Sequence, residues 1–303
     1  MKRAIVVVGS LNMDLVVHTP RHPQPGETIL GGDFGAYPGG KGANQAVAAA
    51  RLGGMVTLVG RAGKDAFGES LIQTLAQDGV STAHVGRSAE AATGVALITV
   101  DASGQNTIVV APGANGQLTP EDVAAAEEVF AGAGVVVMQL ECPVPAVQRA
   151  VALARKHDAQ VILNPAPAQP LAGSLLKDLD YLIPNQGELA LLTGEADLRA
   201  AARQLRQTGV RHVAVTLGGE GVFLLDEAGE FQLPAHVVKV LDTVAAGDAF
   251  VGAFAVALTE GRPAREAAVW GNAAGALAVT RSGAQPSLPR RAELEDFLRE
   301  QPA

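Results

Sequence analysis

The chain has 303 residues, of which 48% are hydrophobic and 4% aromatic, and its formal net charge is −8. This composition allows a large aliphatic core, and the acidic balance argues against nucleic acid or an anionic membrane surface as a partner. One cysteine, Cys142, excludes an intrachain disulfide, and no apolar run reaches the roughly 18 residues of a membrane span, so we expect a cytoplasmic protein.

The first predicted element is a buried strand at residues 4–9, an apolar run that ends in Gly-Ser. Asn12, Met13 and Asp14 follow it. Ligands of open α/β sheets bind beyond the carboxyl ends of the strands, so these three residues are candidates for ligand binding. The alternative is ordinary turn chemistry, which Asn and Asp also favour.

Two pairs of short strands are expected outside the main alternation of strands and helices. Residues 15–37 contain three prolines and predict two strands joined by a turn, and residues 93–101 and 107–110 predict a second pair. We expect the insertions at about 14–37 and 92–112 to form a small sheet that acts as a lid and excludes water from a site.

A glycine-rich segment lies between these pairs. Residues 39–45 read Gly-Gly-Lys-Gly-Ala-Asn-Gln and lead into an alanine-rich helix. The glycines allow a ligand close to the backbone, and Lys41 and Asn44 supply donors near the helix start. The spacing does not match the phosphate loop of P-loop proteins. A glycine-rich connection with a solvated lysine is the alternative.

The rest of the chain alternates between strands and helices, which predicts a doubly wound, mainly parallel sheet flanked by helices in a single α/β domain over residues 1–303. Strands are expected at 56–59, 135–141, 161–165, 181–185, 212–217 and 222–225, and helices at 65–77, from 118, at 145–157, from 186, and at 197–208, 249–258, 263–280 and 291–299.

Polar residues follow several of these strands. Glu141, Asn185 and Thr216 stand at predicted strand ends, which face one side of a parallel sheet. Glu188 lies three residues after Asn185, so the pair either caps a helix or points into one crevice, where Glu188 could hold a hydrated Mg²⁺. Residues 218–221, Gly-Gly-Glu-Gly, form either a hairpin turn or a ledge for a nucleotide.

The segment with the clearest chemistry is 242–248. Ala245, Ala246 and Gly247 precede Asp248, and an apolar helix follows. The unpaired amides of a helix start bind anions, and a carboxylate beside them could take the proton of an attacking hydroxyl in phosphoryl transfer. The alternative is an acid that only complements the helix dipole.

Residues 39–45 and 242–248 resemble the two signature motifs of the ribokinase-like sugar kinases. The resemblance covers nearly the whole chain, because the other polar segments follow in family order. It implies ATP-dependent phosphorylation of D-ribose at O5, with Asp248 as general base and an anion hole at Ala245, Ala246 and Gly247. Another sugar or nucleoside kinase of this fold, acting on fructose, deoxyribose or a nucleoside, and a non-catalytic sugar-binding protein are the alternatives.

The resemblance also implies binding residues. Those for the sugar are Asn12, Met13, Asp14, Gly39, Gly40, Lys41, Gly42, Ala43, Asn44 and Glu141. Those for ATP are Asn185, Thr216, Leu217, Gly218, Gly219, Glu220, Gly221, Gly247 and Asn272, with Glu188 assisting Mg²⁺ through water. Those for a potassium ion are Asp242, Val244, Ala278, Arg281, Gly283 and Ser287. Val244 stands where the family commonly has Thr. Pairing of the lid strands between subunits would give a homodimer.

Overall fold

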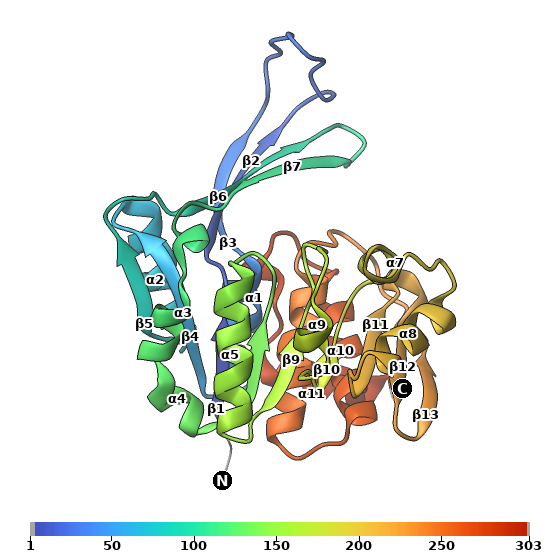
Figure 1. Ribbon diagram of the computed structural model, residues 1–303. Helices are drawn as coiled ribbons and strands as arrows, with labels where there is room; N and C mark the ends of the chain where they lie inside the picture. Colours follow the sequence, from blue (N-terminus) through green and yellow to red (C-terminus); the bar gives the residue numbers. More distant parts are fainter. Residues whose placement is uncertain (1–3, 302–303) are drawn as a thin grey trace.

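The computed structural model describes residues 4–301. Its central sheet has nine strands in the order β13-β12-β11-β10-β9-β8-β1-β4-β5 (Figure 1). Their bounds are β1 (Ala4–Val8), β4 (Val56–Gly63), β5 (Ser81–Ser88), β8 (Ala133–Met138), β9 (Gln160–Leu163), β10 (Tyr181–Leu182), β11 (His212–Thr216), β12 (Val222–Asp226) and β13 (Gly229–Leu233). All neighbours pair in parallel except β11 with β12 and β12 with β13. The expected mainly parallel sheet is therefore confirmed.

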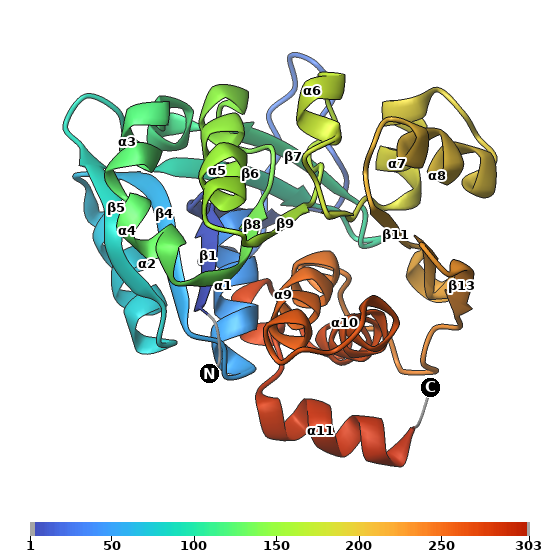
Figure 2. The ribbon, with the colours of Figure 1, turned by 60° about the horizontal axis from the view of Figure 1, so that its bottom comes forward.

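Helices cover both faces of this sheet, because alternate residues of β1 enter two different cores. Ile5 and Val7 belong to one core, and Val6 and Val8 belong to the other. Figure 2 shows the two helical layers. The first contains α1 (Lys41–Arg51), α2 (Ala66–Gln77), α9 (Ala246–Thr259), α10 (Ala264–Ala278) and α11 (Arg291–Glu300). The second contains α3 (Pro120–Ala125), α4 (Glu127–Ala131), α5 (Val144–Lys156), α6 (Gly173–Leu176), α7 (Gln186–Thr193) and α8 (Leu198–Gln207).

Helices α1 and α9 lie against each other in the first layer. Every residue of α9 from Asp248 to Leu258 is buried. A Cβ atom added at Gly252 of α9 would lie 2.5 Å from the Cβ of Ala48 and 2.9 Å from the backbone nitrogen of Ala49. The two helices approach this closely because their contact surfaces carry glycine and alanine, and the approach brings their first turns together.

A second, four-stranded sheet projects from the central one (Figure 1). Its order is β3-β2-β6-β7, with β2 (Asn12–His18), β3 (Phe34–Gly39), β6 (Gly94–Val100) and β7 (Asn106–Ala111). Both predicted strand pairs form, but the two pairs also join, because β2 runs parallel to β6. The first strand was predicted from residue 15 and begins at Asn12, so Asn12, Met13 and Asp14 belong to the small sheet.

Other boundaries differ from the sequence prediction. The strand expected at 181–185 is only two residues long, and Asn185 instead caps α7. The strand expected to reach Glu141 ends at Met138, so Glu141 lies in the following loop. Strands β5 and β13 were not predicted; both line the edges of the sheet, where exposed polar residues interrupt the apolar pattern. Among residues 4–301, no helix is long and apolar enough to cross a membrane.

Candidate active site

The first turn of α9 has free backbone donors. Ala245 precedes the helix with φ 59 in the left-handed region, and no side chain caps the helix. Such a conformation costs a non-glycine residue about 1–3 kcal/mol, and it is typical of functional sites. Within the described chain, the N–H groups of Gly247 and Asp248 have no acceptor, and that of Ala246 has only Thr243 O at 3.4 Å. This turn can therefore receive an anion.

Asp248 lies in this turn and joins the two sequence motifs. Asn44 Nδ2 and Gln45 Nε2, both on α1, each donate to one carboxylate oxygen of Asp248, and both distances are 2.9 Å. Asp248 is 7% exposed. Burial raises its pKa above the ordinary value, while Lys41 and the two amide donors act in the opposite direction. A buried carboxylate with a raised pKa beside free amides is suited to proton transfer.

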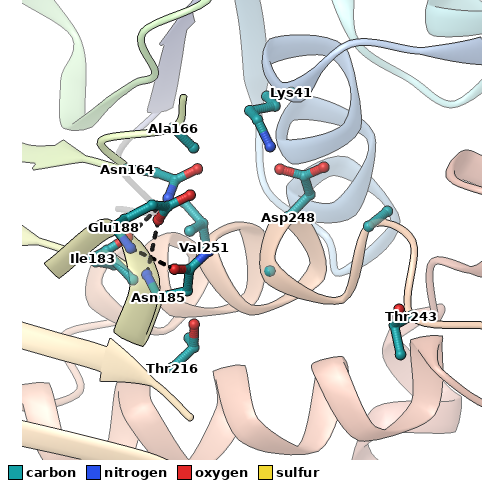
Figure 3. Close-up of a pocket in the computed structure, with 12 residues that line it drawn as sticks. Lys41, Asn164, Ala166, Ile183, Asn185, Glu188, Thr216, Thr243, Asp248 and Val251 are labelled. Atoms are coloured by element: carbon teal, nitrogen blue, oxygen red, sulfur yellow. Dashed lines mark hydrogen bonds between the residues drawn. The ribbon is translucent and has the colours of Figure 1, made fainter. Parts of the chain in front are cut away.

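Lys41 faces Asp248 across the site (Figure 3). Burial alone would lower the pKa of Lys41, but the charges of Asp248, Glu141, Glu188 and Asp14 outweigh it and raise the pKa. The lysine therefore carries its positive charge among four acids. It is the cation placed to hold an anionic group between the first turns of α1 and α9.

The start of α1 is built by close backbone contacts. Gly40 has φ 88, and a Cβ there would lie 2.6 Å from Asn12 N. Glu141 accepts from the N–H of Lys41 at 3.0 Å and from the hydroxyl of Ser10. Asp14 lies against Gly39, where a Cβ would be 2.2 Å from Asp14 Oδ2. Burial, with Glu141 and Asp248 nearby, raises the pKa of Asp14 to about 7.

The predicted sugar residues thus gather at one place, but they do not all offer side chains. Asp14, Lys41, Asn44 and Glu141 do. Asn12 is 2% exposed, and its side-chain oxygen accepts from Asn115 Nδ2 at 2.8 Å. Met13 and Ala43 are buried in the core, so their side chains are not available to a ligand. Met13 and Ala43 could therefore contact a sugar only through backbone atoms, because residues adjacent in a motif alternate between the site and the core.

A cavity of ≈ 190 Å³ lies between α1, α7 and the start of α9 (Figure 3). Lys41, Glu188 and Asp248 line it together with Asn164 and Thr243, which the sequence reading did not identify. Asn185 and Glu188 cap α7, which is one of the two roles expected for them. They form a capping box in which both hydrogen bonds are 2.8 Å long. Because only Oε2 of Glu188 accepts in that box, the other carboxylate oxygen can still serve a ligand in the cavity.

A second cavity, of ≈ 540 Å³, lies between residues 235–240 and the helices α9 and α10. It is lined by most of the residues predicted for a nucleotide: Asn185, Thr216, Gly218, Gly219, Gly221, Gly247 and Asn272. Leu217 and Glu220 do not line it. The tight turn at 218–220 connects the antiparallel strands β11 and β12, so the hairpin and the ledge are the same structure. The apolar wall at Val237, Val238 and Val240 was not predicted.

The two cavities share four lining residues: Asn185, Thr216, Thr243 and Gly247. They are therefore adjacent, and the free amides of α9 lie where they meet. A large, mainly apolar cavity beside a small, charged one can hold two different substrates with their reactive ends at Gly247.

The residues predicted for potassium lie on two loops that Asp242 connects. One carboxylate oxygen of Asp242 accepts from Val244 N at 3.0 Å, and the other accepts from Gly283 N at 2.8 Å. The side chain of Arg281 pairs with Glu293, and the hydroxyl of Ser287 donates to Ala284 O. Ala278 is buried. Oxygen atoms of backbone carbonyls and of one carboxylate are suitable ligands for a large monovalent cation, so the residues fit that ion.

Among residues 4–301, no group of three or more His, Cys, Asp or Glu side chains is arranged to hold a metal ion. Glu188 and Asp248 are the two carboxylates that line the smaller cavity, near Asn185 and Gly247, which line both cavities. One carboxylate fits Mg²⁺, which keeps most of its waters and takes further oxygens from phosphates.

The sequence matches the family described as pfkB family carbohydrate kinase over residues 2–291. It is 40% identical to a ribokinase of Haemophilus influenzae over 98% of this chain and 99% of that protein, and 37% identical to a deoxyribokinase of Salmonella typhi over 97% and 98%. A ribokinase structure of Arabidopsis thaliana complexed with ribose and ATP matches with a TM-score of 0.92 at 35% identity, covering 98% of this chain and 99% of that one. Sequence and backbone similarity therefore extend over nearly the whole chain.

Proposed function

The chain belongs to the pfkB family of carbohydrate kinases, as its two motifs predicted, and we propose that it transfers the terminal phosphoryl group of ATP to O5 of D-ribose. The observation that carries this proposal is the meeting of the two cavities at Gly247, where Asp248 and the free amides of α9 lie between them. A sugar at the start of α1, beside Asp248, and a nucleotide in the large cavity would present their reactive ends to the same turn.

Asp248 acts as the general base. It takes the proton of the sugar hydroxyl as the bond from O5 to the phosphorus forms and the bond to the ADP oxygen breaks. The amides of Ala245, Ala246 and Gly247 stabilise the negative charge on the moving phosphoryl group, and Lys41 adds a positive charge on the opposite side. The products are D-ribose 5-phosphate and ADP.

The sugar hydroxyls bind at the start of α1. Asp14 and Glu141 accept from them, and Asn44 contributes its side-chain oxygen, which is buried and has no donor within the described chain. Asn12 and the glycines 39, 40 and 42 shape this pocket. The adenine and ribose of ATP bind in the larger cavity against Thr216, Gly219 and Asn272, where the apolar wall at 237–240 suits a base.

Two cations complete the proposal. Mg²⁺, held by Glu188 through water, would neutralise charge on the phosphates. Potassium would bind at the loops joined by Asp242. It would be surrounded by the backbone carbonyl groups of Val244, Ala278, Arg281 and Gly283, and by Ser287. Val244 can contribute only its carbonyl. The ion would fix the loop that carries Ala245.

The small sheet would act as the lid of the site, and its exposed apolar residues favour pairing with a second copy. Leu97, Ile108 and Val109 are 51%, 51% and 66% exposed. A homodimer formed through these strands would cover them. We also propose that the enzyme works in the cytoplasm, in keeping with its single buried cysteine.

Deoxyribose is the second candidate substrate, because a relative at 37% identity is a deoxyribokinase. The polar groups at the start of α1 favour a sugar with a full set of hydroxyls. Each buried polar group that a deoxy sugar leaves without a partner would cost about 1–3 kcal/mol. A nucleoside is less suitable, because the small cavity beside Asp248 is lined mainly by polar side chains and its lining has no aromatic ring to stack a base.

The test is a coupled assay of ADP formation across pentoses, hexoses and nucleosides, with potassium or with sodium alone. We expect the highest kcat/KM with D-ribose and a higher rate in potassium. If deoxyribose, fructose or a nucleoside is turned over faster than ribose, that compound is the substrate in place of ribose. Equal rates in the two salts would remove the potassium site from the proposal.

A further inference from the structure

A chain of side-chain amides leads from Asp248 into the protein, and one of its members, Asn164, also lines the smaller cavity. Gln139 Nε2 donates to Gln45 Oε1 at 2.6 Å, and Gln45 Nε2 donates to Asp248 Oδ1 at 2.9 Å. Gln45 Nε2 also donates to Asn164 Oδ1 at 3.1 Å, and Asn164 Nδ2 donates to the backbone oxygen of Ile183 at 2.8 Å. Gln45 and Gln139 are each 1% exposed. The chain therefore connects α1, the loop after β8 and the end of β9 to one carboxylate.

The direction of every amide in this chain is determined by its ends. An ionised carboxylate only accepts, so Gln45 must present its NH₂ group to Asp248. Its oxygen must then face a donor, which is the NH₂ group of Gln139. The carbonyl of Ile183 likewise requires the NH₂ group of Asn164, which leaves the Asn164 oxygen for Gln45. The hydrogen bonds agree at each step, so the chain holds one carboxylate oxygen in a single orientation.

Packing alone does not account for these glutamines. Both side chains are buried, and leucine or methionine of similar volume would fill the same space without the loss of hydration that a buried amide suffers. Space for Gln139 depends on Gly9, because a Cβ at residue 9 would lie 2.1 Å from Gln139 Oε1. Gln139 Oε1 itself has no partner within the described chain. A group retained despite these penalties has a role toward the carboxylate.

We propose that Gln45, held by Gln139, is a positioning residue that fixes the carboxylate of Asp248 for proton transfer. This inference rests on the proposed role of Asp248 as the base. Gln45 donates to Oδ1 and Asn44 donates to Oδ2, so both carboxylate oxygens are held and each keeps a further lone pair for a substrate proton. Donation to the carboxylate also favours its ionised form, which is the form that acts as a base.

The test replaces each glutamine by methionine, which keeps the length of the side chain and removes the amide. For Gln45→Met we expect kcat to fall by roughly tenfold to a hundredfold, because a hydrogen bond to a charged group is lost. For Gln139→Met, which leaves Asp248 untouched, we expect a decrease of roughly threefold to tenfold. The affinity for ribose, measured by calorimetry, stays within about twofold in both. Gln117→Met is the matched control, since it removes a hydrogen bond that Ser88 donates at 2.7 Å, and Gln117 lines neither cavity, so kcat should be unchanged.

The pH profile separates positioning from a structural role. Loss of the donor raises the pKa of Asp248, so the acidic limb of kcat against pH should move upward by roughly 0.5 to 1 unit in Gln45→Met. Lys41, Asp14, Glu141 and Glu188 also face this carboxylate, and none of them is changed in either variant. In an Asp248→Asn background, the additional Gln45→Met substitution should have no further effect on the residual rate.

The outcomes distinguish this inference from the proposed function. An active Asp248→Asn variant would overturn both. An impaired Asp248→Asn variant, with both methionine variants indistinguishable from Gln117→Met, would leave the function and remove the positioning role. Equal losses of kcat and of ribose affinity without a change in the pH profile would show that the glutamines only support the fold.

Discussion

Helices α1 and α9 both bring their first turns to the site, and they differ in what happens to their amides. At α1 all four leading N–H groups have protein acceptors. Lys41 donates to Glu141, Gly42 to the hydroxyl of Ser10, Ala43 to the carbonyl of Ser10, and Asn44 to Gly40. At α9 the N–H groups of Gly247 and Asp248 donate to nothing within residues 4–301.

The difference shows how one site divides two tasks between two similar elements. The start of α1 is already satisfied, so it can be rigid and can present side chains, namely Lys41 and Asn44. The start of α9 keeps its donors for an anion. Backbone conformation follows the same division: α1 is preceded by Gly40, for which φ 88 is easily adopted, whereas α9 is preceded by Ala245 at φ 59, where a non-glycine residue is strained.

The largest expected effect comes from the acid at the start of α9. Asp248→Asn should lower kcat by about 10²–10⁴-fold, because an amide cannot accept the proton. Ribose binding, measured by calorimetry, should change little, since the substituted group keeps its shape. Asp197→Asn is a matched control, because Asp197 caps α8 and asparagine caps equally well. An Asp248→Asn enzyme as fast as that control would assign the base to another residue.

The second prediction uses the pH dependence of stability to test how the acids around α1 ionise. In the folded chain the pKa of Asp14 is about 7, against 3.8 for an unperturbed aspartate. Between these values the folded state keeps a proton that the unfolded state has lost, so the free energy of unfolding falls as pH rises from about 4 to about 7. Asp14→Asn removes this decrease.

We therefore expect Asp14→Asn to be more stable than the parent at pH 8 by on the order of 2 kcal/mol, less than the full shift implies because the carboxyl reaches solvent. At pH 4 the two should be nearly equal. Denaturant unfolding at both pH values measures the difference. A stability difference that is the same at pH 4 and pH 8 would mean that Asp14 ionises normally.

The smallest expected effect is the change in stability when the glycine at the start of α9 is replaced by alanine. The glycine before α1 gives the contrast. A Cβ at Gly247 would meet nothing within 4 Å, so Gly247→Ala should raise the free energy of unfolding by about 0.5–1 kcal/mol. The same methyl group would obstruct a phosphate approaching the amides, and we expect kcat/KM for ATP to fall by roughly tenfold. Thermal unfolding and initial rates measure the two effects.

Gly40→Ala provides the contrast, because its Cβ would lie 2.6 Å from Asn12 N at a φ of 88. We expect it to destabilise the fold by roughly 2 kcal/mol or more. If Gly247→Ala kept full activity, the amides at the start of α9 would not touch the phosphate.

The sequence was sufficient for the α/β fold and for the meeting of its two motifs. Runs of apolar residues interrupted by glycine and capping residues are local signals, and the helices expected at 65–77 and from 118 were found from them. The resemblance to the ribokinase-like sugar kinases implied that residues 39–45 and 242–248 serve one site, and Asn44 and Gln45 do contact Asp248. Strand β5 was not predicted, because its polar and apolar residues do not follow a regular two-residue period.

The support behind the site was not predicted. Gln139 interrupts an otherwise apolar stretch, and a single amide in such a stretch was the available signal. Its partner, Gln45, was read only as the end of a motif. Their hydrogen bond links residues 94 positions apart, and nothing in either local sequence indicates the other. The same holds for Ser10, whose contact with Glu141 spans 131 positions.

The two hydrogen bonds to Asp248 span 204 and 203 positions. During synthesis the donors on α1 leave the ribosome long before the carboxylate does, and helix α9 can pack only after most of the sheet exists. A chain that is interrupted or cleaved before this helix would have the surfaces that recognise a sugar but no base. Products of translation that end before residue 248 would therefore transfer no phosphoryl group to a sugar.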